Sequence, residues 1–247
     1  MPPNPYQQPQ PPRRNGWLIG GLAAGLVVLL IGGAIVTWVV FGSSAPYASF
    51  GDCEELLAED VLDGVPGAEG SSVEQADTID GADIDEANFQ EGQECQAAGD
   101  LDNPYGTDET LVNVFMYWHA TETEEEDYSK VQRDLGRTLD EFEETFQIDF
   151  AEDGGTAASA DTNAEFEMRE SSTGDGGHVV LANDPDDELG FLHENGVWAT
   201  SAFTTRNLEV YVTYSGTSDV SAEEHLEIAA DLGDAVHRQV SRTVETE

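Results

Sequence analysis

Five histidines are the side chains of this chain best suited to acid–base or metal chemistry. They are His119, His178, His193, His225 and His237. None forms a zinc motif such as His-Glu-x-x-His, and the sequence contains no Gly-x-Ser-x-Gly elbow and no Walker loop. His225 and His237 are expected on the last helix. The sequence therefore predicts no catalytic residue, no cofactor and no enzymatic activity.

Two acidic stretches offer the oxygen ligands that Ca²⁺ prefers in proteins. They are 80–86 (DGADIDE) and 184–188 (DPDDE). Neither has EF-hand spacing, because in 184–195 the glycine stands seventh instead of sixth and Asn195 replaces the final glutamate. Acids are so abundant here that such clusters also arise from composition alone. The candidates for a divalent-cation site are Asp184, Asp186, Asp187 and Glu188.

The charge of the chain excludes several classes of partner. The 247 residues contain 51 acids and 9 bases, a formal net charge of −42 at pH 7, and 39% are hydrophobic. Phosphate would be repelled, which excludes non-specific nucleic-acid binding and disfavours docking on an anionic lipid surface. Residues 1–51 contain no acid, so the entire acidic charge follows them. This asymmetry predicts two different environments.

An uncharged apolar run over residues 17–41 is long enough to cross a membrane. As a helix it would extend roughly 37 Å, against a hydrocarbon core of about 30 Å. Arg13 and Arg14 precede the run and acids follow it, so the N-terminus is predicted to be cytoplasmic and the remainder extracytoplasmic. We expect a single-pass signal anchor in the cell membrane. The alternative is a signal peptide cleaved near Ser43-Ser44-Ala45.

The segments on either side of the span are short. Residues 1–16 form a Pro/Gln-rich tail that favours polyproline II and is expected to be disordered in the cytoplasm. Residues 42–51 form a linker. Two Gly-x-x-x-Gly patterns, Gly16–Gly20 and Gly21–Gly25, allow a homodimer through the span.

The two cysteines, Cys53 and Cys95, both follow the span. An even number of cysteines in an oxidising compartment predicts a disulfide between them. No histidine lies between them to complete a metal site, and their spacing is not that of a Cys-x-x-Cys redox pair.

Two halves of the outer region, about 93–150 and 178–242, resemble each other. The strand-like 112–121 overlays 208–217, and a Ser/Thr-x-x-Glu capping box follows each, at Thr123 and Ser221. Both following helices carry Asp-Leu-Gly at the same place and an apolar stripe. The stripes consist of Val131, Leu135 and Leu139 in the first helix and Ile228, Leu232 and Val236 in the second. The pattern predicts an internal duplication of a hairpin followed by a helix.

The predicted fold class is therefore α+β, an antiparallel sheet with helices packed on one face. It occupies residues 52–247 and opens with a helix over Cys53–Leu62. Two stretches rich in small and acidic residues, 63–92 and 151–177, are expected to be loops. A cupped sheet face that gathers Phe115, Tyr117 and Tyr211 would favour ligand binding over catalysis.

This layout resembles the actinobacterial membrane-anchored exported proteins with a two-cysteine, sensor-like outer domain. The residues that carry the resemblance are Cys53-Glu54-Glu55-Leu56-Leu57, Val65-Pro66-Gly67 and Cys95. Those families are largely of unassigned function, and the resemblance implies an extracytoplasmic binding, accessory or sensory domain. A protein or small-molecule ligand is the expected partner. The alternatives are a divalent-cation-dependent domain and a hydrolase whose site has no recognisable motif.

Overall fold

The computed structural model describes residues 45–80, 89–103, 110–119, 128–151, 154–159, 163–184, 196–217 and 219–246. The chain divides into two units, Met1–Ser44 and Ala45–Glu247. The predicted tail and span lie in the first unit, outside the described residues. In the described part, no helix is both long and apolar enough to cross a membrane.

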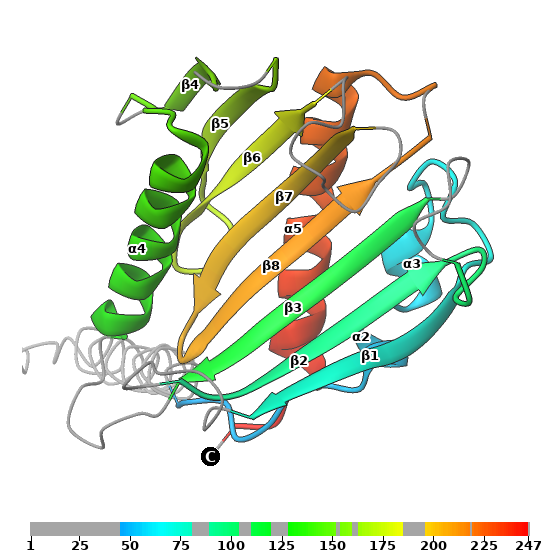
Figure 1. Ribbon diagram of the computed structural model, residues 1–247. Helices are drawn as coiled ribbons and strands as arrows, with labels where there is room; N and C mark the ends of the chain where they lie inside the picture. The colour runs from blue at the N-terminus through cyan, green and yellow to red at the C-terminus, as the bar shows by residue number, and fades with distance from the viewer. Residues whose placement is uncertain are drawn as a thin grey trace, which may run out of the picture. The chain divides into compact units, whose positions relative to one another are not determined.

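The second unit is built on one antiparallel sheet of eight strands, in the order β1-β2-β3-β8-β7-β6-β5-β4 (Figure 1). The α+β class with an antiparallel sheet is confirmed. The strands are β1 (Ser72–Asp80), β2 (Phe89–Ala98), β3 (Leu111–His119), β4 (Gly154–Ala158), β5 (Glu165–Ser171), β6 (Gly177–Asn183), β7 (Val197–Thr205) and β8 (Leu208–Ser215). The helices are α2 (Cys53–Leu56), α3 (Glu59–Leu62), α4 (Ser129–Phe146) and α5 (Ala222–Thr243).

The hairpins β2–β3 and β7–β8 meet at the middle of the sheet, where Phe115 pairs with Tyr211. The pairs three residues away on either side are Val112 with Tyr214 and Trp118 with Leu208. In the predicted overlay of 112–121 on 208–217, Val112 corresponds to Leu208 and Trp118 to Tyr214. Replacing both members of one pair by their counterparts therefore gives the other pair. The pairing thus has a local two-fold relation, which is compatible with the duplication. The duplication itself stays a prediction.

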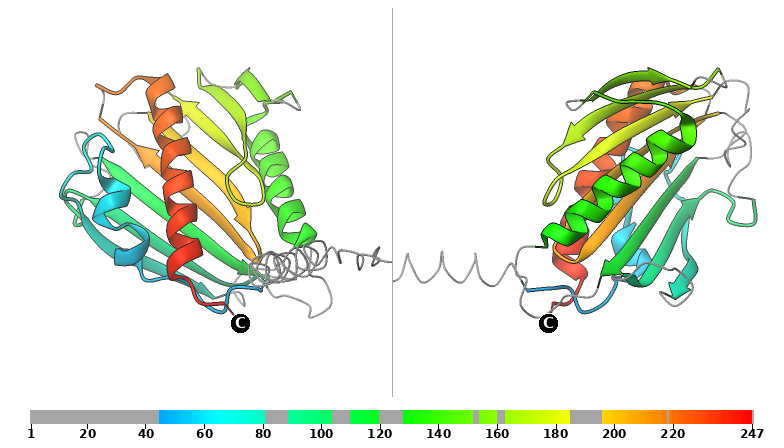
Figure 2. Two further views of the ribbon diagram at one scale, coloured as in Figure 1. Left: turned by 180° about the vertical axis from the view of Figure 1, so that it is seen from behind. Right: turned by 60° about the vertical axis from the view of Figure 1, so that its left-hand side comes forward.

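Helix α5 crosses one face of the sheet and forms the main core with it (Figure 2, left). Its start at Ser221 is the predicted capping box, with Glu224 as the reciprocal partner. The helix lies so close to β7 that a β-carbon on Gly233 would collide with the Ser201 side chain. The buried apolar side chains of this helix are Leu226, Ala229, Leu232, Val236 and Val240.

Helix α4 packs on the opposite face, so the expectation of helices on one face only was wrong (Figure 2, right). On the α5 face, α2 and α3 already contact α5 beside β1. On the other face β5 to β7 present an apolar surface, where Phe142 and Phe146 pack against Phe166. Helix α4 begins at Ser129, after Tyr128 at φ +46°, and the predicted Thr123 box lies outside the described residues.

Both stretches expected to be loops contain strands. β1 forms within 63–92, and its exposed acidic side chains suit the edge of a sheet. β4 and β5 form within 151–177, where Phe166 and Met168 alternate with polar residues and are buried. The predicted opening helix is also divided, because α2 ends before Ala58 caps α3. The many small and acidic residues of these stretches made the short alternation of apolar and polar residues, which indicates a strand, hard to recognise.

The predicted disulfide between Cys53 and Cys95 is present, with its two Cα atoms 5.4 Å apart. It joins the start of α2 to the middle of β2. Both cysteines are buried, and the Gln93 side-chain amide donates to each sulfur, at 3.2 Å and 3.3 Å. The bond therefore fixes the α2–α3 segment to the α5 face of the sheet.

The chain enters the domain through a clasp formed by Tyr47 with Trp118, Arg206 and Asn207. Tyr47 is 1% exposed; its N–H donates to Asn207 Oδ1 at 2.7 Å, and its carbonyl accepts from Asn207 Nδ2 at 3.0 Å and Trp118 Nε1 at 3.1 Å. The Arg206 guanidinium lies 4.5 Å from the centre of its ring. Tyr47 also bridges to Thr246, which brings the start and the end of the domain together.

Candidate ligand-binding cavity

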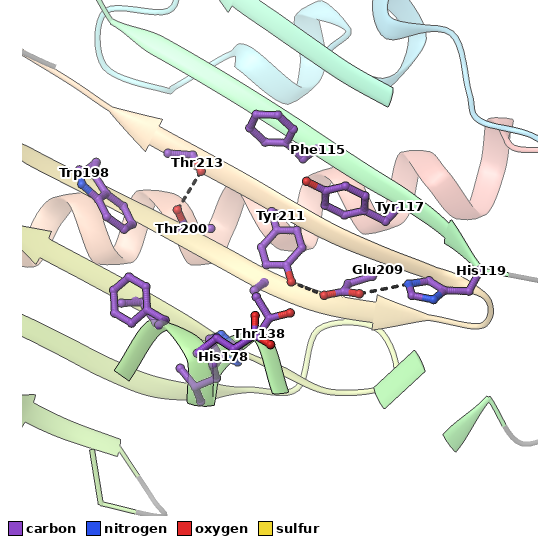
Figure 3. Close-up of a pocket in the computed structure, with 15 residues that line it drawn as sticks. Phe115, Tyr117, His119, Thr138, His178, Trp198, Thr200, Glu209, Tyr211 and Thr213 are labelled. Atoms are coloured by element: carbon purple, nitrogen blue, oxygen red, sulfur yellow. Dashed lines mark hydrogen bonds and ion pairs between the residues drawn. The ribbon is translucent and has the colours of Figure 1, made fainter. Parts of the chain in front are cut away.

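A cavity of about 470 Å³ lies between α4 and the sheet face opposite α5 (Figure 3). Volumes of this size are typical of sites for small organic molecules. Its wall comes from α4 and from strands β3, β6, β7 and β8. The residues that line it are Phe115, Tyr117, His119, Thr138, Leu139, Glu141, Phe142, His178, Val180, Trp198, Thr200, Ala202, Glu209, Tyr211 and Thr213.

Strand alternation decides which side chains reach the cavity. Successive residues of a strand point to opposite faces, so Tyr211 and Thr213 face the cavity while Val210 and Val212 enter the α5 core. The three aromatic residues whose gathering would favour ligand binding, Phe115, Tyr117 and Tyr211, all lie on this wall. The sheet is therefore apolar on one face and aromatic with polar groups on the other.

Aromatic rings make up much of the wall. Tyr117 and Tyr211 meet edge to face with ring centres 5.9 Å apart, and Phe142 of α4 meets Trp198 in the same way at 6.3 Å. Edge-to-face contacts hold the rings in defined orientations. Ring faces and edges are thus presented from both the helix and the sheet.

A carboxylate, Glu209, sits in this aromatic wall and is only 5% exposed. Its Oε1 accepts a hydrogen bond from the Tyr211 hydroxyl, and its Oε2 lies 3.1 Å from His119 Nε2 (Figure 3). Behind His119, Asp134 Oδ2 lies 3.7 Å from Nδ1, an electrostatic contact longer than a hydrogen bond. The imidazole thus stands between two carboxylates, one of them in the cavity wall.

Two other titratable groups of the wall are kept neutral. Burial lowers the pKa of His178 to about 4, although the nearby Glu209 carboxylate acts in the opposite direction. Burial, and then the negative charge of Glu209, raise the pKa of Tyr211 well above 10. At neutral pH the wall therefore offers a neutral imidazole and a neutral phenol. Thr200 and Thr213 complete the polar set with a 2.8 Å hydrogen bond between their hydroxyls.

The predicted cation site is not brought together in the described residues. Asp184 is 1% exposed at the end of β6, where its N–H donates to the Gly196 carbonyl at 2.6 Å. Asp186, Asp187 and Glu188 lie outside the described residues, as do 81–86. Across the described ranges no three acid, histidine or cysteine side chains are grouped as a metal would require. The cation site stays a prediction.

The histidines separate into two groups. His119 and His178 line the cavity, whereas His225 and His237 lie on α5 as expected, and His193 lies outside the described residues. Sequence reasoning missed Glu209 and Trp198 as members of one site. The available signal was Glu209, the one charged residue of the strand 208–215, because a buried charge needs hydrogen-bonding partners.

Comparisons with known proteins leave the family open. The sequence matches no protein-family model and no curated protein. Among solved structures it is similar to the extracellular domain of PknH from Mycobacterium tuberculosis, with 12% identity and a TM-score of 0.40. That alignment covers 76% of this chain and 92% of the PknH domain.

Proposed function

We propose that this protein is a non-catalytic ligand-binding protein whose α+β domain lies outside the membrane and is anchored by the span over 17–41. The cavity between α4 and the sheet carries the proposal. Its walls are largely aromatic, and polar groups are fixed at a few points, which is the usual composition of a small-molecule site. An extracytoplasmic location is supported by the disulfide and by Arg13 and Arg14, the bases that precede the predicted span.

Binding explains the polar groups of the wall better than proton transfer does. Both oxygens of Glu209 are engaged by Tyr211 and His119. The raised pKa of Tyr211 and the lowered pKa of His178 keep both groups neutral near pH 7. A general acid or base works best with a pKa near the working pH. These groups instead present a fixed pattern of charge and hydrogen bonding.

The clasp around Tyr47 supports the anchoring part of the proposal. It fastens the chain to the domain six residues after the predicted end of the span at residue 41, so a membrane tether would hold the domain by a short connection. The clasp also contacts the cavity wall, because the backbone N–H of His119 donates to the backbone carbonyl of Asn207 at 3.0 Å.

The binding function is tested by uptake of a neutral fluorescent probe, N-phenyl-1-naphthylamine, by the oxidised domain 45–247. We expect saturable binding at one site. Thr200→Phe should weaken it at least tenfold, because the ring would fill the cavity. Thr156→Phe is the matched control, since it makes the same substitution at an exposed position of the edge strand β4, outside the cavity. Equal binding by both variants, or no saturable binding by the native domain, would contradict the proposal.

A further inference from the structure

We propose that the ligand of the cavity is an organic cation, an ammonium group held among aromatic rings near the Glu209 cluster. The inference rests on the proposed binding function and adds the chemical class of the ligand. Three properties of the wall lead to it: its charge, its ring faces and its lack of basic side chains.

The first property is a net negative charge close to the cavity. Glu209, His119 and Asp134 form one cluster, with 3.1 Å and 3.7 Å between the imidazole nitrogens and the two carboxylates. With both carboxylates ionised, the cluster keeps one negative charge if the imidazole is protonated and two if it is neutral. Because Glu209 is buried, solvent and salt screen this charge less than they screen charges at the surface. A bound cation would compensate it.

The second property is the number of ring faces and their origin. Tyr117 and Tyr211 come from the sheet, Phe142 comes from α4, and Trp198 lies close to Phe142. Aromatic faces attract cations through their quadrupole, and cages of several rings are the usual binding sites of quaternary ammonium groups. The Glu209 hydrogen bond fixes Tyr211, so one ring of the cage is already oriented before a ligand enters.

The third property disfavours an anionic ligand. Among the described residues that line the cavity, none is lysine or arginine, and His178 is neutral near pH 7. Arg137, the base on the adjacent surface of α4, is held in a 2.7 Å salt bridge with Glu141 at the rim. The formal charge of −42 on the whole chain further raises the local concentration of cations and lowers that of anions.

Three molecules of one shape and different charge test the inference. They are choline, 3,3-dimethylbutan-1-ol as its neutral isostere, and 3,3-dimethylbutanoate as the anion. The full chain in micelles of the nonionic detergent dodecyl maltoside is titrated by ligand-observed NMR, with empty micelles as the blank. We expect choline to bind about tenfold more tightly than the alcohol, and the anion more weakly than either. An alcohol or anion that binds as tightly as choline would overturn the inference.

Variants test whether the preference for choline over the alcohol comes from the cluster of Glu209, His119 and Asp134. Glu209→Gln should bring the choline-to-alcohol ratio of affinities close to one, and Asp134→Asn, whose side chain is 23% exposed, should lower it about twofold. The second variant keeps the test valid if the first fails to fold. Asp140→Asn removes the same charge from an exposed position of α4 and should leave the ratio unchanged. A ratio retained by both cluster variants would overturn the inference.

The two proposals fail in different ways. If the domain takes up the naphthylamine probe but shows no preference for choline, the cavity binds ligands and only the cationic class is wrong. If the probe does not bind, the binding function itself is wrong. A preference for choline that depends on Glu209 supports both.

Discussion

The two faces of the central strands are packed differently, although the same strands form both. On one face α5 lies close against β7 and β8 and the interior is filled, with Leu226, Leu232 and Val236 almost fully buried. On the other, α4 buries only Val131 and Leu135 of its own residues, and a cavity of about 470 Å³ remains beside it. The comparison indicates that the α5 face contributes most of the packing, whereas the α4 face leaves the space in which we propose that a ligand binds.

The repeated Asp-Leu-Gly segment shows the difference at the level of one residue. Gly233 of α5 allows the helix to approach Ser201, whereas a β-carbon built on Gly136 of α4 would have no heavy atom within 4 Å apart from the adjoining backbone of its own helix. The glycine of the Asp-Leu-Gly segment therefore allows close packing in α5. In α4 the glycine is exposed and only lowers the stability of the helix.

The largest expected effect comes from truncating one leucine on each face. Leu232→Ala removes a fully buried side chain and should lower the free energy of unfolding by about 3 kcal/mol. Leu139→Ala removes a partly exposed side chain at the cavity and should cost about 1 kcal/mol or less. Urea unfolding of both variants measures the difference. Equal losses would mean that both faces carry the fold equally.

The two glycines should respond to alanine with opposite signs. Gly233→Ala should destabilise the domain by about 2 kcal/mol, because the added methyl group collides with Ser201 in a filled interior. Gly136→Ala should stabilise it by up to about 1 kcal/mol, because alanine is the better helix former and the space is open. Thermal unfolding of the pair checks the signs. A stabilising Gly233→Ala would contradict the close approach of α5.

A smaller effect should link the cavity face to pH. The pKa of His178 is about 4 in the folded protein and 6.5 in the unfolded chain, so the unfolded chain binds the extra proton first. Its stabilising contribution is complete above pH 6.5 and declines as the pH falls to 4. The shift corresponds to at most about 3 kcal/mol, which partial exposure reduces to about 1 kcal/mol.

The measurement compares urea unfolding at pH 7.5 and pH 4.5 for the native protein and His178→Gln. On acidification, the free energy of unfolding of His178→Gln should fall by about 1 kcal/mol less than that of the native protein. Some acid sensitivity should remain, because burial also lowers the pKa of His225 and His237 on the other face. Identical acid responses of the two proteins would show that His178 is not desolvated.

Local signals in the sequence were sufficient for the α5 face. The Ser221 capping box and the alternation of 208–214 each depend on a few neighbouring residues, and both are present in the structure. The disulfide, also present, could be predicted without local contacts because the chain has only two cysteines to pair. The face chosen by α4 depends instead on a competition between distant segments. The α2–α3 pair already occupies the space beside α5. On the opposite face Phe166, which lies in a stretch expected to be a loop, packs against α4.

The cavity could be anticipated only in outline for the same reason. Alternation along β3 and β8 places Phe115, Tyr117 and Tyr211 on one side, and this can be read from the sequence. The contribution of Trp198 and His178 requires the order of β8, β7 and β6 in the sheet, and Thr138 requires the position of α4. Strand order and helix placement are long-range properties that no local pattern encodes.

The clasp at Tyr47 determines how a mechanical force would pass through the domain. Tension along the preceding chain would reach Asn207 in the β7–β8 turn and, through the bridge to Thr246, the end of α5. Both points lie at the ends of the segments that hold the α5 face together, so the load falls on the best-packed part of the molecule. The β3 end of the cavity wall lies beside this path, because the His119 backbone N–H donates to the Asn207 carbonyl, so a pull on the chain before Tyr47 would reach the cavity first at its His119 side.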